Sequence, residues 1–309
     1  MLQKILLIRP GAIGDTLMLL PSISILARSH EVYVAGRRPG IEFLSPPAKQ
    51  CFDMEESAWH MLFLESQALP GLPIDEVDIV VCFLSDPQGT IRNNLKAYCP
   101  GAKVFVFPSL PGGLSKMHVA QHVARCLARC GAMVDSRAAM ELATREALLA
   151  EDRQWSIRHK LVLHPGSGSK KKNYSLSLWE ELMQKITRQI GDSSLKQVIL
   201  LGPAEQDTKS LFAETAERLG WDIKSNLSSD ALLTLMRETA LFVGHDSGIS
   251  HLAAMAGAHT IALFKVTEPL IWRPLGPRVA VLEGIGEGQG LVSRILKELD
   301  LRSLSASDK

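Results

Sequence analysis

The sequence lacks the features that mark secreted and membrane-spanning proteins. Its five cysteines, at positions 51, 82, 99, 126 and 130, are an odd number and form no CxxC pair. A disulfide framework is therefore not expected, and a reducing compartment fits better. No window approaches the ~18 apolar residues that a membrane span needs. The first apolar run, Ile5 to Ile8, is too short for the core of a signal peptide. We expect a cytoplasmic protein and leave open a peripheral contact with the inner membrane.

Strong charge and the two commonest nucleotide-binding signatures are also missing. The formal net charge is +1, so no global field attracts nucleic acid and none is expected as a partner. Any anion site must therefore be local. Neither half contains GxGxxG, and no GK[ST] occurs, which argues against a nicotinamide dehydrogenase and a P-loop protein.

What the sequence does contain is an alternation of strand and helix patterns in two halves. Hydrophobic residues make up 46% of the 309 residues, enough for two cores. Apolar strand-like runs occur at 4–8, 31–36, 77–84, 102–107, 160–164, 195–202, 240–245 and 259–264. Helical patterns occur at 16–29, 115–131, 175–190, 205–220 and 228–239, and Pro21 is expected to kink the first. Such alternation predicts an α/β protein with parallel sheets and helices on both faces.

Four motifs follow predicted strands, where open α/β sheets bind their ligands. The first is RPGAIGDTL, residues 9–17, in which Gly11 and Gly14 permit a close turn and Asp15 enters the first helical turn. Asp15 is a candidate general base. The alternative is a carboxylate that only stabilises the start of its helix through the helix dipole.

The second motif, HPGSGSKKKNYS, joins a glycine-serine loop to a run of lysines at residues 164–175. The backbone N–H groups and hydroxyls of Ser167, Gly168 and Ser169 suit a phosphate or diphosphate, and so do the ammonium groups that follow. A lysine run alone would indicate a solvated loop, but a lysine run that directly follows a glycine-serine loop favours a binding site.

The third motif, LLGPAEQD, places Glu205 just beyond a predicted strand. A carboxylate there can accept hydrogen bonds from ribose hydroxyls. A helix N-terminal acid is an equally good interpretation.

The fourth motif, LFVGHDSGISHLAAMAG, changes from strand to helix at residues 241–257. The N–H groups near Ser247 and Gly248 would open the helix unpaired, as an anion site requires. Asp246 would hold the loop or a sugar hydroxyl, and His251 could donate to an oxygen. A lone helix histidine is usually structural, but four polar groups in apolar surroundings favour a functional cluster.

A fifth pattern suggests a metal site and is rejected. His118, His122, Cys126 and Cys130 recur every four residues. The first and last would lie ~18 Å apart along a helix, whereas zinc holds its ligands at ~2.0–2.3 Å. These residues predict a core-facing stripe, and no metal or cofactor is expected.

Taken together, the four motifs resemble glycosyltransferase family 9, the ADP-heptose:lipopolysaccharide heptosyltransferases. They occur in the family's order, and the resemblance covers about residues 1–30 and 160–277. It implies a GT-B fold, with two Rossmann-like domains whose parallel sheets face each other across a cleft. The N-terminal domain, residues 1–155, would bind the acceptor, and residues 156–309 would bind the nucleotide-sugar.

The resemblance also assigns roles. The catalytic aspartate falls on Asp15, the phosphate-contacting lysine on Lys172, and the ribose-binding acid on Glu205. The donor loop falls on Asp246, Ser247, Gly248 and His251. It implies an inverting transfer without a bound metal, from a nucleotide-diphospho-sugar such as ADP-heptose to a glycolipid or glycan.

An acidic acceptor would need arginines. Arg9, Arg37 and Arg38 lie at predicted strand ends and are candidates, although a solvated-surface role suits them as well. Two alternatives to a transferase remain from the sequence: a nucleotide-sugar epimerase of the same fold, and a non-catalytic nucleotide-sugar-binding protein.

Overall fold

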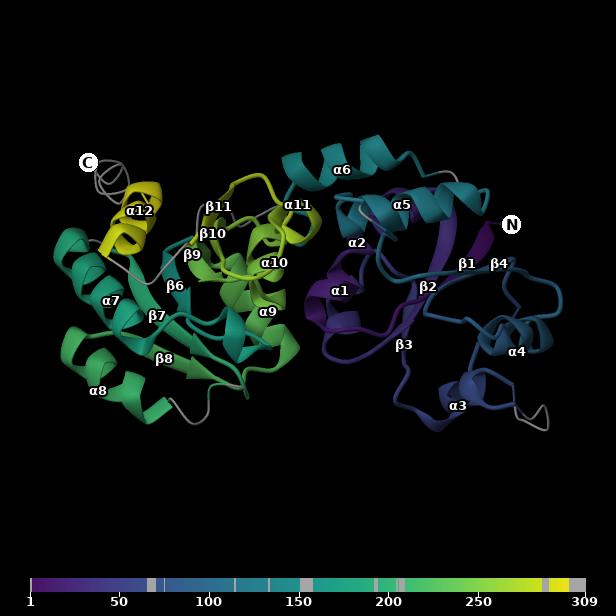
Figure 1. Ribbon diagram of the computed structural model, residues 1–309, viewed down its shortest axis with the longest axis horizontal. Helices are drawn as coiled ribbons and strands as arrows, with labels where there is room; N and C mark the ends of the chain where they lie inside the picture. Colours follow the sequence, from purple (N-terminus) through teal and green to yellow (C-terminus); the bar gives the residue numbers. More distant parts are fainter. Residues whose placement is uncertain are drawn as a thin grey trace. The chain divides into compact units, whose positions relative to one another are not determined.

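The chain folds into two compact units, each built on one parallel sheet (Figure 1). The computed structural model describes residues 2–65, 71–74, 76–113, 115–132, 134–150, 158–191, 194–203, 205, 209–284 and 289–299. The units are Met1–Ala143 and Thr144–Lys309. The expected boundary at 155/156 lies outside the described residues, and helix α6 (Ser136–Arg145) spans the observed division.

The first unit has a sheet of strand order β3-β2-β1-β4-β5. Its strands are β1 (Gln3–Ile8), β2 (His30–Gly36), β3 (Gln50–Asp53), β4 (Ile79–Phe83) and β5 (Lys103–Phe107). Strand β1 is central and pairs in parallel with β2 and β4, with Ile5 opposite both Val32 and Ile79. The carboxyl ends of β1, β4 and β5 therefore meet at one edge of the sheet.

Helices cover both faces of this sheet. They are α1 (Ile13–Leu17), α2 (Leu20–Leu26), α3 (Ser57–His60), α4 (Thr90–Tyr98) and α5 (Val119–Arg129). One face packs Leu6 and Ile8 against α3 and α4 in a common core, while α2 and α5 lie side by side. The helix expected over 16–29 is divided between α1 and α2. Pro21 stands in the first turn of α2, where its missing N–H costs no hydrogen bond.

The second unit has six strands in the order β11-β10-β9-β6-β7-β8. They are β6 (Lys160–His164), β7 (Lys196–Leu201), β8 (Asp222–Ser225), β9 (Thr239–His245), β10 (His259–Phe264) and β11 (Val279–Glu283). The chain runs from β6 outward through β7 and β8, then returns to β9 and runs outward the other way. This is the order of a doubly wound nucleotide-binding sheet, with its switch point between β6 and β9.

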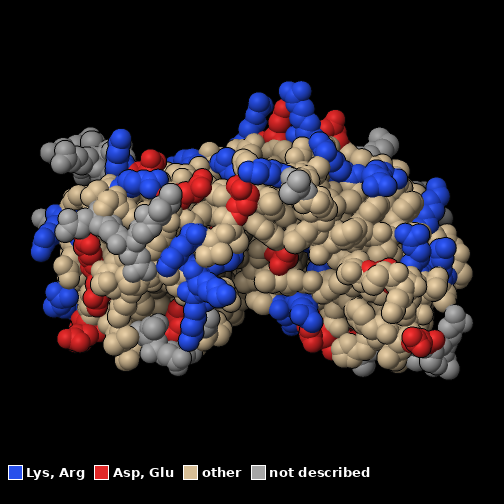
Figure 2. Space-filling model, viewed as in Figure 1, with Lys and Arg blue, Asp and Glu red and all other residues tan. Residues whose placement is uncertain are grey.

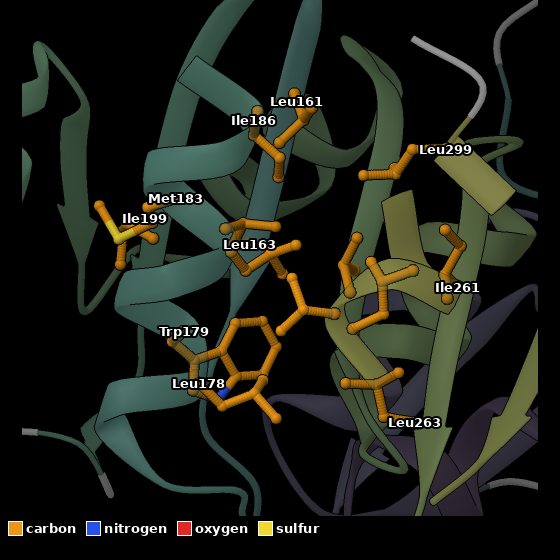
Figure 3. Packing of buried hydrophobic residues seen from close by; sticks show 14 of the residues in the cluster. Leu161, Leu163, Leu178, Trp179, Met183, Ile186, Ile199, Ile261, Leu263 and Leu299 are labelled. Atoms are coloured by element: carbon orange, nitrogen blue, oxygen red, sulfur yellow. The ribbon is translucent and has the colours of Figure 1, made fainter. Parts of the chain in front are cut away.

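The core of the second unit fixes helix α7 (Leu176–Ile190) against the sheet. With α8 (Lys209–Leu219) and α12 (Gln289–Leu299), α7 covers one face, while α9 (Ser229–Arg237) and α10 (Gly248–Met255) belong to the other (Figure 1). Figure 3 shows Leu161 and Leu163 of β6 directed toward Ile186 and Trp179 of α7. All four side chains are at most 1% exposed. Trp179 is therefore held rigidly close to the carboxyl end of β6.

The histidine-cysteine stripe serves helix α5 and the core. His118 is the N-cap of α5, and its Nδ1 accepts a hydrogen bond from the Ala120 N–H at 3.2 Å. Cys126 and Cys130 are buried, and burial raises the pKa of their thiols to about 11 and about 12. Across the described residues, no three His, Cys, Asp or Glu side chains gather as a metal site would need. Nor is any helix there long and apolar enough to cross a bilayer.

Candidate active site

Three loops of the second unit meet at the switch point of its sheet. They follow β6, β9 and β10, which are neighbours in the sheet. Lys172 Nζ lies 2.6 Å from Asp246 Oδ2, although 74 residues separate them in the chain. The Thr267 hydroxyl donates to the same carboxylate oxygen. The pair joins the loop after β6, residues 165–175 (the lysine loop), to the start of α10, and Thr267 adds the loop after β10.

Lys172 keeps donors available for a ligand. Its side chain is 27% exposed, whereas that of Asp246 is 6% exposed. An ammonium group has three N–H donors, and one carboxylate cannot occupy all of them. Lys170 and Lys171 are exposed and have no described ion pair. Within the described residues, Lys172 is thus the lysine of the run that is turned into the site.

Helix α10 begins beside this pair with free backbone donors. Ser247 is its N-cap residue, and no side chain caps the helix. For the described part of the chain, no hydrogen bond is recorded for the N–H groups of Gly248 and Ile249. The Ser247 hydroxyl is buried and also lacks a described partner. Unpaired N–H groups at a helix start attract anions through their partial positive charge.

The glycine-serine loop mainly organises itself. The Ser167 hydroxyl lies 2.9 Å from the Ser169 carbonyl oxygen and 2.6 Å from Asn173 Oδ1. Ser167 is 6% exposed, so it braces the loop from within. Gly168 is exposed, and a Cβ atom added there would meet nothing within 4 Å. A phosphate contact at residues 167–169 stays a prediction.

Glu205 and His251 are more enclosed than the sequence suggested. Glu205 is 6% exposed, and its Oε2 accepts the Gly202 N–H at 2.7 Å. Its carboxylate packs so closely on Gly166 that a Cβ atom there would lie 1.9 Å from it. His251 is 2% exposed. Glu205 braces its own loop, and the donor contacts of Glu205 and His251 stay predictions.

In the first unit, Asp15 stands at the end of the central strand β1. It lies in the first turn of α1, and its side chain is 36% exposed. Arg9 Nε donates to the Asp15 carbonyl oxygen at 2.9 Å, and Arg9 Nη2 lies 3.6 Å from Asp15 Oδ1. A Cβ atom at Gly11 would come within 2.5 Å of the Asp15 Cβ. The turn therefore presents the carboxylate to solvent with a cation at its side.

The acceptor role expected for Arg9 does not fit its burial. Arg9 is 1% exposed, its Nη1 donates to the Ser109 carbonyl oxygen at 2.9 Å, and its guanidinium stacks 5.6 Å from the Phe83 ring centre. Desolvation lowers its pKa, which the nearby Asp15 partly opposes. Because the central strand ends here under covering loops, Arg9 holds Asp15 in place instead of facing a substrate.

Arg37 and Arg38 are exposed but already paired. Arg37 Nε lies 2.8 Å from Glu55 Oε1, and Arg38 lies 3.3 Å from both Glu42 and Asp53. Figure 2 shows basic and acidic side chains intermixed over the viewed face, in keeping with a net charge of +1. An acceptor would have to compete with these carboxylates.

A cavity of about 530 Å³ opens at the carboxyl ends of β4 and β5 in the same unit. Its polar lining comes from Ser85, Asp86, Gln88 and Arg92. Both Asp86 carboxylate oxygens accept backbone N–H groups of α4, from Ile91 at 3.1 Å and Arg92 at 3.0 Å. Among the described residues, the Arg92 guanidinium has no recorded partner. Sequence reasoning did not find this cavity.

The family model of glycosyltransferase family 9 (heptosyltransferase) matches residues 119–292, more than half of the 309-residue chain. The chain belongs to glycosyltransferase family 9. It is a glycosyltransferase, as the four motifs indicated. No curated protein matches the sequence significantly.

Solved structures show that this family 9 chain has the GT-B fold. E. coli ADP-heptose LPS heptosyltransferase II matches with a TM-score of 0.69 and 18% identity over 99% of both chains. E. coli heptosyltransferase WaaC with ADP matches with a TM-score of 0.65 and 14% identity, over 96% of this chain and 99% of the other. A glycosyl transferase of family 9 from Veillonella parvula matches with a TM-score of 0.65 and 14% identity, over 98% of this chain and 93% of the other. Identities this low establish the fold alone.

Two buried histidines in the second unit predict that the fold loses stability at acidic pH. Burial lowers the pKa of His245 to about 3 and also lowers that of His164. In the unfolded chain each would titrate near ~6.5. Between those values the unfolded state binds more protons, so the free energy of unfolding falls as the pH drops. We expect the melting temperature to fall from pH 6.5 to 4, because the free energy of unfolding loses up to ~1.4 kcal/mol per pH unit through His245. His245→Gln should flatten this dependence, and an unchanged slope would contradict the assignment.

Proposed function

We propose that this glycosyltransferase moves a heptose, or a related sugar, from a nucleotide-diphospho-sugar to a glycan hydroxyl with inversion. The expected donor is ADP-heptose, and the expected acceptor is the core of lipopolysaccharide or another glycan. Family membership supports the reaction class. The donor proposal is supported by two distant structural relatives, one named as an ADP-heptose enzyme and one solved with ADP.

The observation that carries the donor half is the Lys172–Asp246 contact at the open start of α10. It brings an ammonium group, free amide donors and a buried hydroxyl to one point. That point is the switch point between β6 and β9, where doubly wound sheets bind phosphates. A diphosphate fits this set because its oxygens can accept from all three kinds of donor.

In the proposed reaction, the acceptor oxygen attacks the anomeric carbon from the side opposite the diphosphate. Asp15 takes the proton of that hydroxyl as the new C–O bond forms. The bond from the anomeric carbon to the diphosphate oxygen breaks, and the nucleoside diphosphate leaves with the electron pair. Lys172 and the N–H groups at 247–249 would stabilise the growing negative charge. We propose that these groups, and not a metal ion, carry that charge.

A panel of nucleotides tests the donor proposal. Each of ADP, ADP-heptose, UDP-GlcNAc and GDP-mannose is added to the purified chain, and the melting temperature is measured. A ligand at ~100 times its Kd should stabilise the folded chain by ~2.7 kcal/mol. ADP and ADP-heptose are expected to raise the melting temperature most. If only UDP-GlcNAc or GDP-mannose stabilised the chain, the proposed donor would be wrong. If none of the four ligands did, the proposed donor site would be wrong.

The same reagents separate the alternative functions. An epimerase would convert the nucleotide-sugar without any acceptor, which chromatography of donor alone would reveal. A non-catalytic binding protein would bind ADP and transfer nothing to any glycan.

For the acceptor, we propose the cavity beyond β4 and β5. It opens on the same edge of the sheet as Asp15, and β4 borders the central strand β1. Arg9 links the two places, since it contacts both Asp15 and the Ser109 carbonyl oxygen that follows β5. Ser85 and Gln88 offer hydrogen bonds to sugar hydroxyls, and Arg92 offers a cation that has no partner within the described part of the chain.

Arg92→Ala is expected to raise the KM for the acceptor about 10-fold, the value of one charge-assisted hydrogen bond. The KM for the donor should stay unchanged. Lys96→Ala is the matched control, because Lys96 is exposed one turn further along α4 and does not line the cavity. Equal acceptor KM values in the two variants would remove the cavity from the acceptor site. Steady-state rates at varied acceptor concentration make the comparison.

A further inference from the structure

His245 is a buried histidine at the end of β9 that the reaction above does not use. It is 0% exposed, and it immediately precedes Asp246. Its Nε2 accepts the backbone N–H of Tyr174 at 2.9 Å, across 71 residues of chain. Because Nε2 accepts, the imidazole is neutral and carries its proton on Nδ1. The histidine therefore ties the lysine loop to β9 two residues beyond Lys172.

Aromatic contacts fix the ring of His245 on two sides. It stacks on Tyr174 with centres 5.5 Å apart and planes 19° apart, and it meets Trp179 edge-on at 5.2 Å and 76°. Trp179 is 1% exposed in the core shown in Figure 3. These contacts hold the imidazole with its acceptor nitrogen directed at the Tyr174 N–H.

The backbone of His245 is attached to α10 as well. The Ser250 hydroxyl donates to the His245 carbonyl oxygen at 2.5 Å. A single residue consequently connects the loop after β6 to both β9 and the helix that opens the anion site. From outside, Lys265 Nζ donates to the Asn173 carbonyl oxygen at 3.2 Å and lies 5.1 Å from the Tyr174 ring centre.

The lysine loop needs such an anchor. Its other described ties are the Ser167–Asn173 hydrogen bond, the exposed Lys265–Asn173 hydrogen bond and the Lys172–Asp246 pair itself. Partly exposed ion pairs hold a geometry weakly because water competes for both charges. The Tyr174–His245 hydrogen bond is buried and faces no such competition.

We propose that His245 is a positioning residue for the donor diphosphate, which it serves by holding Lys172 at the start of α10. This inference rests on the proposed donor site. His245 touches no substrate, and its effect passes through Lys172. A histidine that only filled the core would affect stability but would not be coupled to Lys172.

The test removes the acceptor nitrogen and measures ADP binding by calorimetry on the full chain. His245→Leu keeps most of the side-chain volume but has no hydrogen-bond acceptor. His245→Asn keeps a polar side chain, but its amide does not reach the Nε2 position. His245→Gln places an amide oxygen near that position. We expect His245→Leu and His245→Asn to weaken ADP binding about 10-fold, which corresponds to one buried hydrogen bond. His245→Gln should retain most of the ADP affinity.

A double-mutant cycle with Lys172→Ala decides between positioning and packing. In the Lys172→Ala background, His245→Asn should cause no further loss of ADP affinity, since the group it positions is gone. The KM for the nucleotide-sugar should rise in the single variant while the KM for the acceptor stays constant. Equal losses in both backgrounds, or unchanged ADP affinity in His245→Asn, would overturn the inference. Failure of the unaltered chain to bind ADP would instead overturn the donor site itself.

Discussion

Asp15→Asn is expected to lower kcat by ~10²–10⁴-fold, the usual contribution of a general base. Asparagine has nearly the same shape, and its amide oxygen can still face Arg9. The backbone hydrogen bond from Arg9 to the Asp15 carbonyl oxygen is unaffected. The variant should therefore fold normally and bind ADP with unchanged affinity, while it cannot take the acceptor proton.

The measurement is the rate of ADP release at saturating donor and acceptor. Glu141→Gln is the control, because it removes a similar charge from an ion pair on the surface of α6. A kcat for Asp15→Asn close to that of the control would remove Asp15 from the base role. Loss of ADP affinity would indicate damage to the fold and not to the chemistry.

Lys172→Ala is expected to reduce kcat/KM by ~10²–10³-fold, as the loss of one donor to a developing anion does. ADP affinity should fall as well, because the lysine binds the diphosphate in the ground state and in the product. Lys172→Arg should recover part of the loss, since it keeps the charge but changes its geometry.

Lys171→Ala provides the matched control for this variant. It removes the same charge from the neighbouring position, where the side chain is exposed. Any general effect of loop charge would appear in both variants. If ADP affinity and kcat/KM were equal in the two, the lysine run would be a solvated turn and the proposed donor site would be wrong.

The buried strands were predictable because their patterns are local. Runs such as 4–8, 160–164 and 259–264 are apolar on both faces, and the structure confirms them as β1, β6 and β10. The edge strands β3, β8 and β11 were missed. Strand β8, Asp222–Ser225, has no buried residue, and β3 and β11 have one each, because these edge strands are covered less completely than the central ones.

The candidate site divides in the same way. Glycines, serines and lysines at strand ends are visible in the sequence, and so is Asp15 in its turn. Which of three consecutive lysines meets Asp246 depends on a contact across 74 residues, which no local pattern contains. The contact of His245 Nε2 with the Tyr174 N–H is equally non-local, because in the sequence His245 is only the last residue of an apolar strand.

The environments of the three arginines were not predictable for a related reason. Arg9, Arg37 and Arg38 all follow strands, so no local pattern distinguishes a buried arginine from an exposed one among them. The structure buries Arg9 beneath the end of the central strand and pairs the other two with carboxylates. Arg92, which lines a cavity, lies inside a helix and carried no motif.

One measurement tests the central proposal most directly. The purified chain is incubated with ADP-heptose and a heptose-free core glycan, and NMR then reports the anomeric configuration of the product. We predict release of ADP only when the acceptor is present, together with a glycosidic bond opposite in configuration to that of the donor. A product of retained configuration, or conversion of the donor without any acceptor, would contradict a single displacement assisted by Asp15.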